Sequence, residues 1–253
     1  MTYTHYDSLN NAVVFITGGA SGIGKEMVRA FAAQQARIGF LDIDTERGIA
    51  LEHELTEQGI PAKFVACDLR DISELKKGFD TLHEVLGDAK VLVNNAARDD
   101  RHDWEEVTEE YYNERIATNL RHMFFSIQAV APGMIRAGTG SIINMGSNSW
   151  WEAAGGFPVY TTSKAAVHGM TRSFARDLGT YRIRVNTVVP GWIMTERQKR
   201  LWVTPESIEK HRQRQCLPDL IEPHYVARMV LFLASDDAAL CTANNYMVDG
   251  GSI

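Results

Sequence analysis

Cysteine and proline are both scarce in this sequence. Three cysteines, Cys67, Cys216 and Cys241, occur in 253 residues, and no two of them form a Cys-x-x-Cys pair. Their odd number and wide spacing exclude a disulfide framework and a cysteine-based zinc site, and they favour reduced thiols in the cytoplasm. The seven prolines form no proline-rich linker. Because repeats and low-complexity stretches are absent too, we predict one domain spanning residues 1–253.

Long apolar runs, basic clusters and metal-ligand spacings are also missing. No apolar run approaches the roughly 20 residues of a membrane-spanning helix, and residues 1–11 lack the basic and apolar regions of a signal peptide. The net charge is −6 and basic residues form no dominant block, so neither a membrane nor nucleic acid is an expected partner. The eight histidines show no spacing such as His-Glu-x-x-His, so we expect no metal.

Short β-branched apolar runs alternate with longer stretches that have helical spacing. Strands are predicted at residues 13–17, 38–41, 63–66, 91–93, 141–145, 184–189 and 246–248. Helices are predicted at residues 27–35, 73–86, 109–137 and 164–179, among others. This alternation is typical of an α/β protein with a doubly wound parallel sheet, here of about seven strands, and helices on both faces. Residues 195–220 interrupt the alternation, either as a mobile segment over a site or as a solvated surface helix.

A glycine-rich turn, Thr17–Gly24, joins the first predicted strand to a helix that begins near Lys25. Glycines at 18, 22 and 24 allow a tight turn, close approach to a pyrophosphate and close helix packing, and the helix N-terminus supplies amide donors. The strand before the turn and the helix after it are the context that a dinucleotide site requires.

Acidic and small residues follow the next strands. Asp42, 18 residues after Gly24, can bind an adenosine ribose and repel a 2′-phosphate, and Ser21 and Ile43 offer no guanidinium, so NAD is favoured over NADP. The alternative for Asp42 is a helix N-terminal cap. Asp68 could lie beside the adenine, and Asn94–Ala97 could let a flat cofactor approach, although both segments could also be plain strand exits.

Tyr160 and Lys164 are four residues apart, and Ser147 lies 13 residues before Tyr160. On a helix, such a pair shares one face, and a nearby cation lowers the pKa of a phenol from about 10 toward neutrality. A proton-transfer site is therefore conceivable. Taken alone, the pair arises by chance in many chains, as a packed tyrosine beside a solvated lysine.

Together these motifs resemble the short-chain dehydrogenase/reductase family along essentially the whole chain. The resemblance implies a Rossmann-type fold in which Tyr160 removes a substrate hydroxyl proton while hydride leaves for a nicotinamide. It also implies that Ser147 holds the substrate oxygen, that Lys164 binds the nicotinamide ribose, and that Asn119 holds a water linked to Lys164. Ala97 replaces a usual glycine, which is sterically tolerated. The cofactor-binding residues predicted from the motifs and the resemblance are Gly18, Ser21, Gly22, Ile23, Gly24, Asp42, Asp68, Leu69, Asn95, Ala96, Ala97, Tyr160, Lys164, Pro190, Gly191, Ile193 and Thr195.

Further segments look like bacterial aldose 1-dehydrogenases of that family, which act on xylose, arabinose or galactose. These segments are residues 99–102, 119–123, 128–134, 196–206 and 231–242. Indole faces and polar side chains near the site suit a sugar, although packing alone could explain each of them. The predicted substrate contacts are Ser147, Asn148, Trp151, Tyr160 and Trp192.

The sequence therefore predicts an NAD-dependent oxidation of an aldose at its anomeric hydroxyl, giving the lactone. The alternatives are a steroid or 3-oxoacyl substrate, a catalytically silent dinucleotide-binding sensor, and an anion or nucleic-acid patch in residues 197–214, where acidic residues interleave with basic ones. By resemblance, a homotetramer is expected to form through helices in residues 109–137 and 160–179.

Overall fold

The strands form one parallel sheet. The computed structural model describes residues 2–252 and orders the strands β3-β2-β1-β4-β5-β6-β7, with every neighbouring pair parallel. Each strand begins and ends within one residue of its predicted bounds, so the predicted doubly wound sheet is confirmed. The strands are β1 (Val13–Thr17), β2 (Arg37–Asp42), β3 (Ala62–Ala66), β4 (Val91–Asn94), β5 (Gly140–Met145), β6 (Ile183–Pro190) and β7 (Asn245–Val248).

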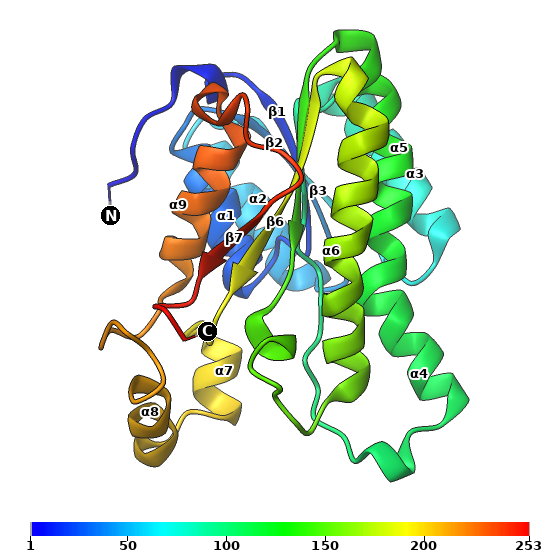
Figure 1. Ribbon diagram of the computed structural model, residues 1–253. Coiled ribbons are helices and arrows are strands. Elements are labelled where there is room, and N and C mark those ends of the chain that lie inside the picture. Colours follow the sequence, from blue (N-terminus) through cyan, green and yellow to red (C-terminus); the bar gives the residue numbers. More distant parts are fainter. Residues whose placement is uncertain (1, 253) are drawn as a thin grey trace.

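Helices cover both faces of the sheet (Figure 1). One layer contains α1 (Gly22–Ala32), α2 (Thr45–Glu57) and α9 (Pro223–Ala234), and the other contains α3 (Ile72–Leu86), α5 (His122–Ala137) and α6 (Pro158–Leu178). In β1, Val14 and Ile16 pack toward the first layer, and Val13 and Phe15 toward the second. Because side chains alternate across a strand, a strand covered on both sides appears as an unbroken apolar run.

The order of the strands reverses beside β1. From β1 the chain moves outward through β2 and β3, and then returns to β4 on the other side of β1. The connections diverge at this point, which leaves the crevice where open α/β sheets bind ligands. Thr17 is in register with Asn94, so the glycine-rich turn and the segment after β4 are neighbours at this crevice.

The helix predicted over residues 109–137 is interrupted at a functional candidate. The chain forms α4 (Glu109–Ile116), a π-helical turn η3 (Ala117–Arg121) and then α5. A π turn contains one extra residue per turn and often marks a functional site. Hydrophobic spacing alone does not show such a turn. Similarly, α1 begins at Gly22 rather than near Lys25, because the last glycines of the turn already belong to the helix.

Residues 195–220 form two short helices, α7 (Glu196–Leu201) and α8 (Pro205–Arg212), beyond the carboxyl ends of the strands (Figure 1). The amide of Met194 donates to the carbonyl of Ile221 (2.9 Å), and Ile193 and Ile221 form a β-bridge. The segment therefore leaves and rejoins the body at one point. No helix within residues 2–252 is long and apolar enough to cross a membrane. Short 3-10 turns occur at Asp7–Leu9, Trp104–Glu106, Asn148–Trp150, Gly179–Tyr181 and Asp236–Ala238.

Candidate active site

A cavity of about 1220 Å³ lies along the carboxyl ends of the strands. Its walls come from the glycine-rich turn, the exits of β2, β3 and β4, the segment around residues 145–160, and residues 190–214. Nearly all residues that the sequence predicts for the site line this cavity. The exceptions are Gly24, Asn119 and Trp151.

The glycine-rich turn is packed too tightly for side chains. Gly18 has φ of +68°, and a Cβ there would lie 2.7 Å from the Cα of Ala96. A Cβ at Gly24 would lie 1.8 Å from the carbonyl oxygen of Gly18, so the helix begins directly against the turn. The Asn95 side chain donates to that same carbonyl oxygen at 2.8 Å. Ser21, the N-cap of α1, accepts no hydrogen bond with its side chain, and the first-turn amides therefore suit a pyrophosphate.

Asp42 holds the turn that follows β1. One carboxylate oxygen accepts a hydrogen bond from the amide of Ala20 (2.9 Å), and the other accepts one from the amide of Asp44 (3.0 Å). The N-cap of α2 is Asp44, whose side chain accepts from the amide of Arg47. The alternative that Asp42 caps this helix is therefore wrong, because the helix begins two residues later. Asp42 lines the cavity with lone pairs left for a ribose diol.

Two arginines at this end of the cavity were missed by the sequence reasoning. Arg47 lies in the first turn of α2, and its guanidinium is 3.5 Å from the Asp44 carboxylate. Arg70 pairs with the Asp68 carboxylate at 2.6 Å, and this contact outweighs burial in lowering the pKa of Asp68. Arg47 stands five residues after Asp42 in sequence, and the start of α2 brings both residues to the same cavity. This part of the cavity therefore carries guanidinium groups, which are well suited to binding phosphate.

Tyr160 and Lys164 both project from α6 into the cavity. The Lys164 ammonium is almost completely buried, lies 5.7 Å from the Tyr160 ring centre, and donates to the carbonyl of Met145 at 2.7 Å. Ser147 follows the end of β5, and its hydroxyl donates to the hydroxyl of Ser149 at 3.0 Å. The structure therefore brings the three predicted groups together at one wall.

Burial dominates the acid–base behaviour of this wall. The pKa of Tyr160 is raised to about 12, mainly by burial and also by Asp99, against the lowering effects of the Ser147 hydroxyl and Arg101. Burial also lowers the pKa of Lys164 to about 7, against an opposing effect of Asp99. From its spacing alone, Lys164 is expected to lower the pKa of the Tyr160 phenol. Among the protein groups alone this expectation is wrong, because burial disfavours both charged forms.

Asn119 lies behind this wall in the π turn η3 and is fully buried. Its side-chain oxygen accepts a hydrogen bond from the amide of Arg98 at 2.8 Å, while its Nδ2 has no protein partner. A buried amide donor is costly without an acceptor. The group is therefore suited to binding a water, as the family resemblance implies.

The segment after β6 supplies the remaining wall. Pro190 and Gly191 line the cavity, and the Gly191 amide donates to the carbonyl of Val248 at 3.0 Å. Ile193 is buried, and Thr195 caps α7 by accepting from the amide of Gln198 at 3.2 Å. This arrangement fixes the entry to residues 195–220 at the cavity.

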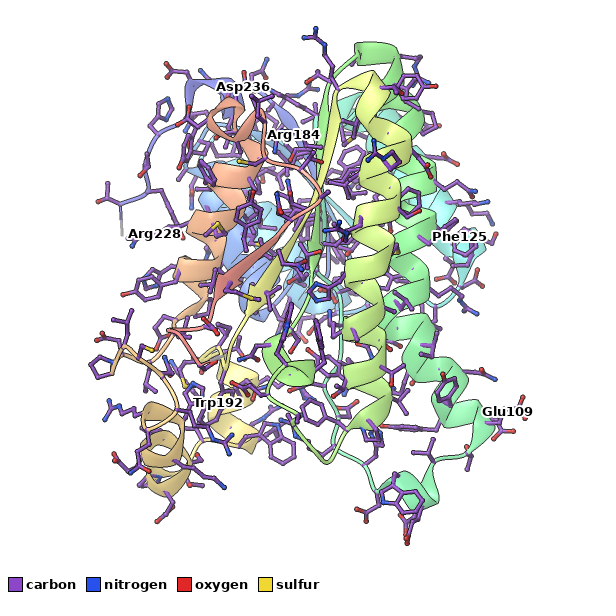
Figure 2. All side chains as sticks on the ribbon, viewed as in Figure 1. Glu109, Phe125, Arg184, Trp192, Arg228 and Asp236 are labelled. Carbon is purple, nitrogen blue, oxygen red and sulfur yellow. The ribbon has the colours of Figure 1, made fainter. Side chains whose placement is uncertain are left out.

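The predicted substrate residues divide into two groups. Asn148 and Trp192 line the cavity; Figure 2 shows Trp192 beside the segment that carries α7. The side-chain Nδ2 of Asn148 donates to the Glu152 carboxylate at 2.8 Å and to the Ser252 hydroxyl at 2.9 Å. Trp151 does not reach the cavity, because its indole stacks on Trp150 with ring centres 3.7 Å apart. It is a packing residue, as its alternative interpretation held.

Cavity residues not predicted as substrate contacts include Asp99, Arg101, Glu152 and His211. Asp99, Arg101 and Glu152 belong to loops whose spacing carries no periodic signal, and His211 lies in the short helix α8. The residues described by the structure contain no group of three or more His, Cys, Asp or Glu side chains that could hold a metal ion.

Comparison with known proteins places this geometry in a family. The model of the family described as "Enoyl-(Acyl carrier protein) reductase" matches residues 18–252. The chain is 48% identical to a D-xylose 1-dehydrogenase of Caulobacter vibrioides, with 99% of each chain covered. It is 45% identical to "Probable galactose dehydrogenase GalD" of Rhizobium meliloti, covering 98% of this chain and 97% of the relative.

Solved structures with the same fold contain nicotinamide cofactors. A 3-oxoacyl-[acyl-carrier protein] reductase of Brucella melitensis with bound NAD matches with a TM-score of 0.88 at 28% identity, covering 100% of this chain and 98% of the other. A blue fluorescent protein from a metagenomic library, in complex with NADPH, matches with a TM-score of 0.87 at 35% identity, covering 97% and 99%. With the motifs, the cavity and the full-length relatives in agreement, the chain belongs to the short-chain dehydrogenase/reductase family.

Proposed function

We propose that this protein is an NAD-dependent aldose 1-dehydrogenase, which oxidises the anomeric hydroxyl of a pentose or hexose to the lactone. The observation that carries the proposal is the full-length likeness to two relatives named for xylose and galactose oxidation. The cavity supports it, because Ser147, Tyr160 and Lys164 meet at one wall. A silent sensor would not need this set of groups.

The proposed roles follow from where the side chains lie. Ser147 positions the sugar hydroxyl by a hydrogen bond, and Tyr160 accepts its proton as general base. Lys164, on the same helix, would bind the nicotinamide ribose hydroxyls. Asn119 would hold a water that links Lys164 to solvent. When bound, the cofactor supplies the hydride acceptor, and its cationic ring favours the phenolate that burial opposes. The proposed sugar contacts besides Ser147 and Tyr160 are Asn148 and Trp192.

A nicotinamide dinucleotide fits the glycine-rich turn, whose backbone leaves space and amide donors for a pyrophosphate. We propose NAD as the preferred form, because the Asp42 carboxylate faces the cavity where a 2′-phosphate would lie. The Arg47 guanidinium, which lines the same cavity, is 64% exposed and near the Asp44 carboxylate, so it compensates Asp42 only in part. NADP use is thus expected to be weaker rather than absent.

We also propose a homotetramer. An apolar groove of about 650 Å³ on the outer side of α5 and α6 is lined by Ile116, Leu120, Arg121, Phe124, Phe125, Ala166, Met170, Ser173, Phe174 and Asp177. Phe124 is 46% exposed there, and Figure 2 shows Phe125 on the same side of the molecule. Arg121 and Asp177 could pair with each other across a twofold axis, which a second copy of the chain would supply. The strand β7, which lies at one edge of the sheet, offers a second contact surface.

For the cell, we propose a cytoplasmic enzyme that works on a small molecule, without nucleic acid or a membrane as partner. The test of the proposed function is a panel of aldoses assayed for NADH at saturating NAD. Xylose, arabinose, galactose or fucose should give NADH with a lactone as first product. If every aldose is inert while a steroid or 3-oxoacyl substrate reacts, the substrate class is wrong although the hydride chemistry survives.

A further inference from the structure

The tetrapeptide Asp99–His102, just beyond β4, connects parts of the site that are distant in sequence. The amide of His102 donates to the carbonyl of Gly156 at 2.8 Å. Its ring Nε2 accepts from the amide of Val159 at 3.5 Å, in the first turn of α6. This loop thus supports the start of the helix that carries the proposed base.

Arg101 reaches the base through an aromatic ring. Its guanidinium carbon lies 3.8 Å from the centre of the Phe157 ring, within the range of a cation–π contact. The Phe157 ring in turn stacks on Tyr160, with centres 5.3 Å apart and planes inclined by 17°. The same guanidinium lies 5.2 Å from the ring of Trp202, just after α7. Arg101 therefore contacts both Phe157, which stacks on the proposed base Tyr160, and Trp202, in the segment that borders the cavity.

The carboxylates of Asp99 and Asp100 make polar contacts with side chains of α7. Gln198 donates to the Asp99 carboxylate at 2.7 Å, and the Arg197 guanidinium lies 3.5 Å from it. Arg197 also pairs with Asp100 at 2.6 Å. The Asp99 side chain is only 20% exposed, so solvent screens these contacts weakly.

These contacts extend to the cavity wall and back to the stack. The side-chain oxygen of Gln198 accepts from the Trp192 indole at 2.9 Å. Arg101 donates to the backbone oxygen of Asp99 at 2.8 Å, and its guanidinium is 3.5 Å from the Asp99 carboxylate. One carboxylate therefore faces α7 on one side and the stacked guanidinium on the other.

We propose that Asp99 and Arg101 are positioning residues that couple the position of α7 to Tyr160. The proposal rests on the proposed function, since it concerns the same base. With α7 in place, Arg197 and Gln198 balance the Asp99 charge. When α7 moves away, that negative charge faces the phenol with less compensation, so the phenolate that accepts the sugar proton is disfavoured. Closure of α7 over a bound sugar would thereby favour the phenolate form of Tyr160.

The two side chains act on Tyr160 with opposite signs. Asp99 raises the pKa of the phenol, and Arg101 lowers it. The other groups that face Tyr160 are the Lys164 ammonium on its own helix and the neutral Ser147 hydroxyl. A purely structural role would not produce opposite effects, so the sign of the change separates positioning from general destabilisation.

The first test compares pH profiles of kcat at saturating NAD for Asp99→Asn and Arg101→Met. The ascending limb should move to lower pH in Asp99→Asn and to higher pH in Arg101→Met, by about one pH unit in each. Arg101→Lys, which keeps the charge, should restore most of the limb. Asp103→Asn is the matched control, because it removes an acidic charge from the same loop at a side chain that makes no capping contact. Limbs that stay in place, or that move in the same direction, overturn the proposal.

The second test needs no turnover. Limited proteolysis within residues 195–220 should be about tenfold faster in Asp99→Asn than in wild type or Asp103→Asn, because Gln198 and Arg197 of α7 lose the negative charge that they contact. Equal cleavage overturns the coupling. Failure of every aldose in the activity panel would count against the proposed function, whereas the proteolysis result would still decide whether Asp99 holds α7.

Discussion

At the scale of single residues, the proposed chemistry depends on the hydroxyl of Tyr160. In Tyr160→Phe the ring can keep its stack on Phe157, while the proton acceptor is lost. We expect kcat to fall at least about 10²-fold, with NAD binding largely kept. Steady-state kinetics together with a fluorescence titration of NAD measures both quantities. Near-normal turnover in the purified variant would remove Tyr160 from the mechanism.

The pH dependence follows from the direction of the pKa change at the same residue. Since burial raises the pKa of Tyr160 to about 12, the phenol is protonated at neutral pH and the base form grows as pH rises. Oxidation at saturating NAD should therefore accelerate from about pH 6 to about pH 9, while the reverse reduction, which needs the acid, should slow. Rates recorded in both directions check this. A flat profile, or acceleration of both directions, contradicts it.

Asp42 is the proposed selector of the cofactor. We expect the wild type to prefer NAD by roughly 10- to 10³-fold in kcat/KM, and Asp42→Ala to narrow this gap, because the repulsion of a 2′-phosphate is lost and Arg47 remains nearby. Glu46→Ala is the control, since it removes an exposed acidic side chain from the first turn of α2 and leaves Asp42 and the Asp44–Arg47 contact in place. An unchanged ratio of the two cofactors in Asp42→Ala would show that it only holds the turn.

Some of these residues could be found from sequence, and others could not. Tyr160 and Lys164 share a helix face, so their spacing alone predicts that they meet. Whether Arg47 reaches the cavity depends on where α2 begins. Asp42 and Asp44 are both possible N-caps in the sequence, so the sequence does not reveal this start. Trp151 was misplaced because a loop has no period that shows which side chain faces inward. The effect of burial on the pKa of Tyr160 can be predicted only from the packing around the side chain, which the sequence does not show.

At the scale of elements, the strands were predictable to within one residue, because each is an apolar run between turns. The segment Glu109–Ala137 was predicted as one helix, yet it contains the π turn that holds Asn119. The sequence of residues 195–220 fits either a mobile segment or a surface helix. In the structure these residues form α7 and α8 beside the cavity.

At the scale of the whole molecule, the apolar groove beside α5 and α6 predicts assembly. Phe124→Glu places a charge in the groove and should convert the proposed tetramer into a smaller species, measured by light scattering after size-exclusion chromatography. Ile49→Glu is the control, because Ile49 is 56% exposed on α2, away from this groove. A monomeric wild type, or an unchanged mass in Phe124→Glu, would contradict the proposed interface.

The most direct measurement of the central claim follows the hydrogen on the anomeric carbon. The enzyme is incubated with NAD and an aldose that carries deuterium only at carbon 1, beginning with xylose, and the products are examined by mass spectrometry and NMR. We predict deuterium on the nicotinamide ring of NADH and the 1,5- or 1,4-lactone as first product, with both lost in Tyr160→Phe. Unlabelled NADH, or oxidation at another carbon, would contradict it.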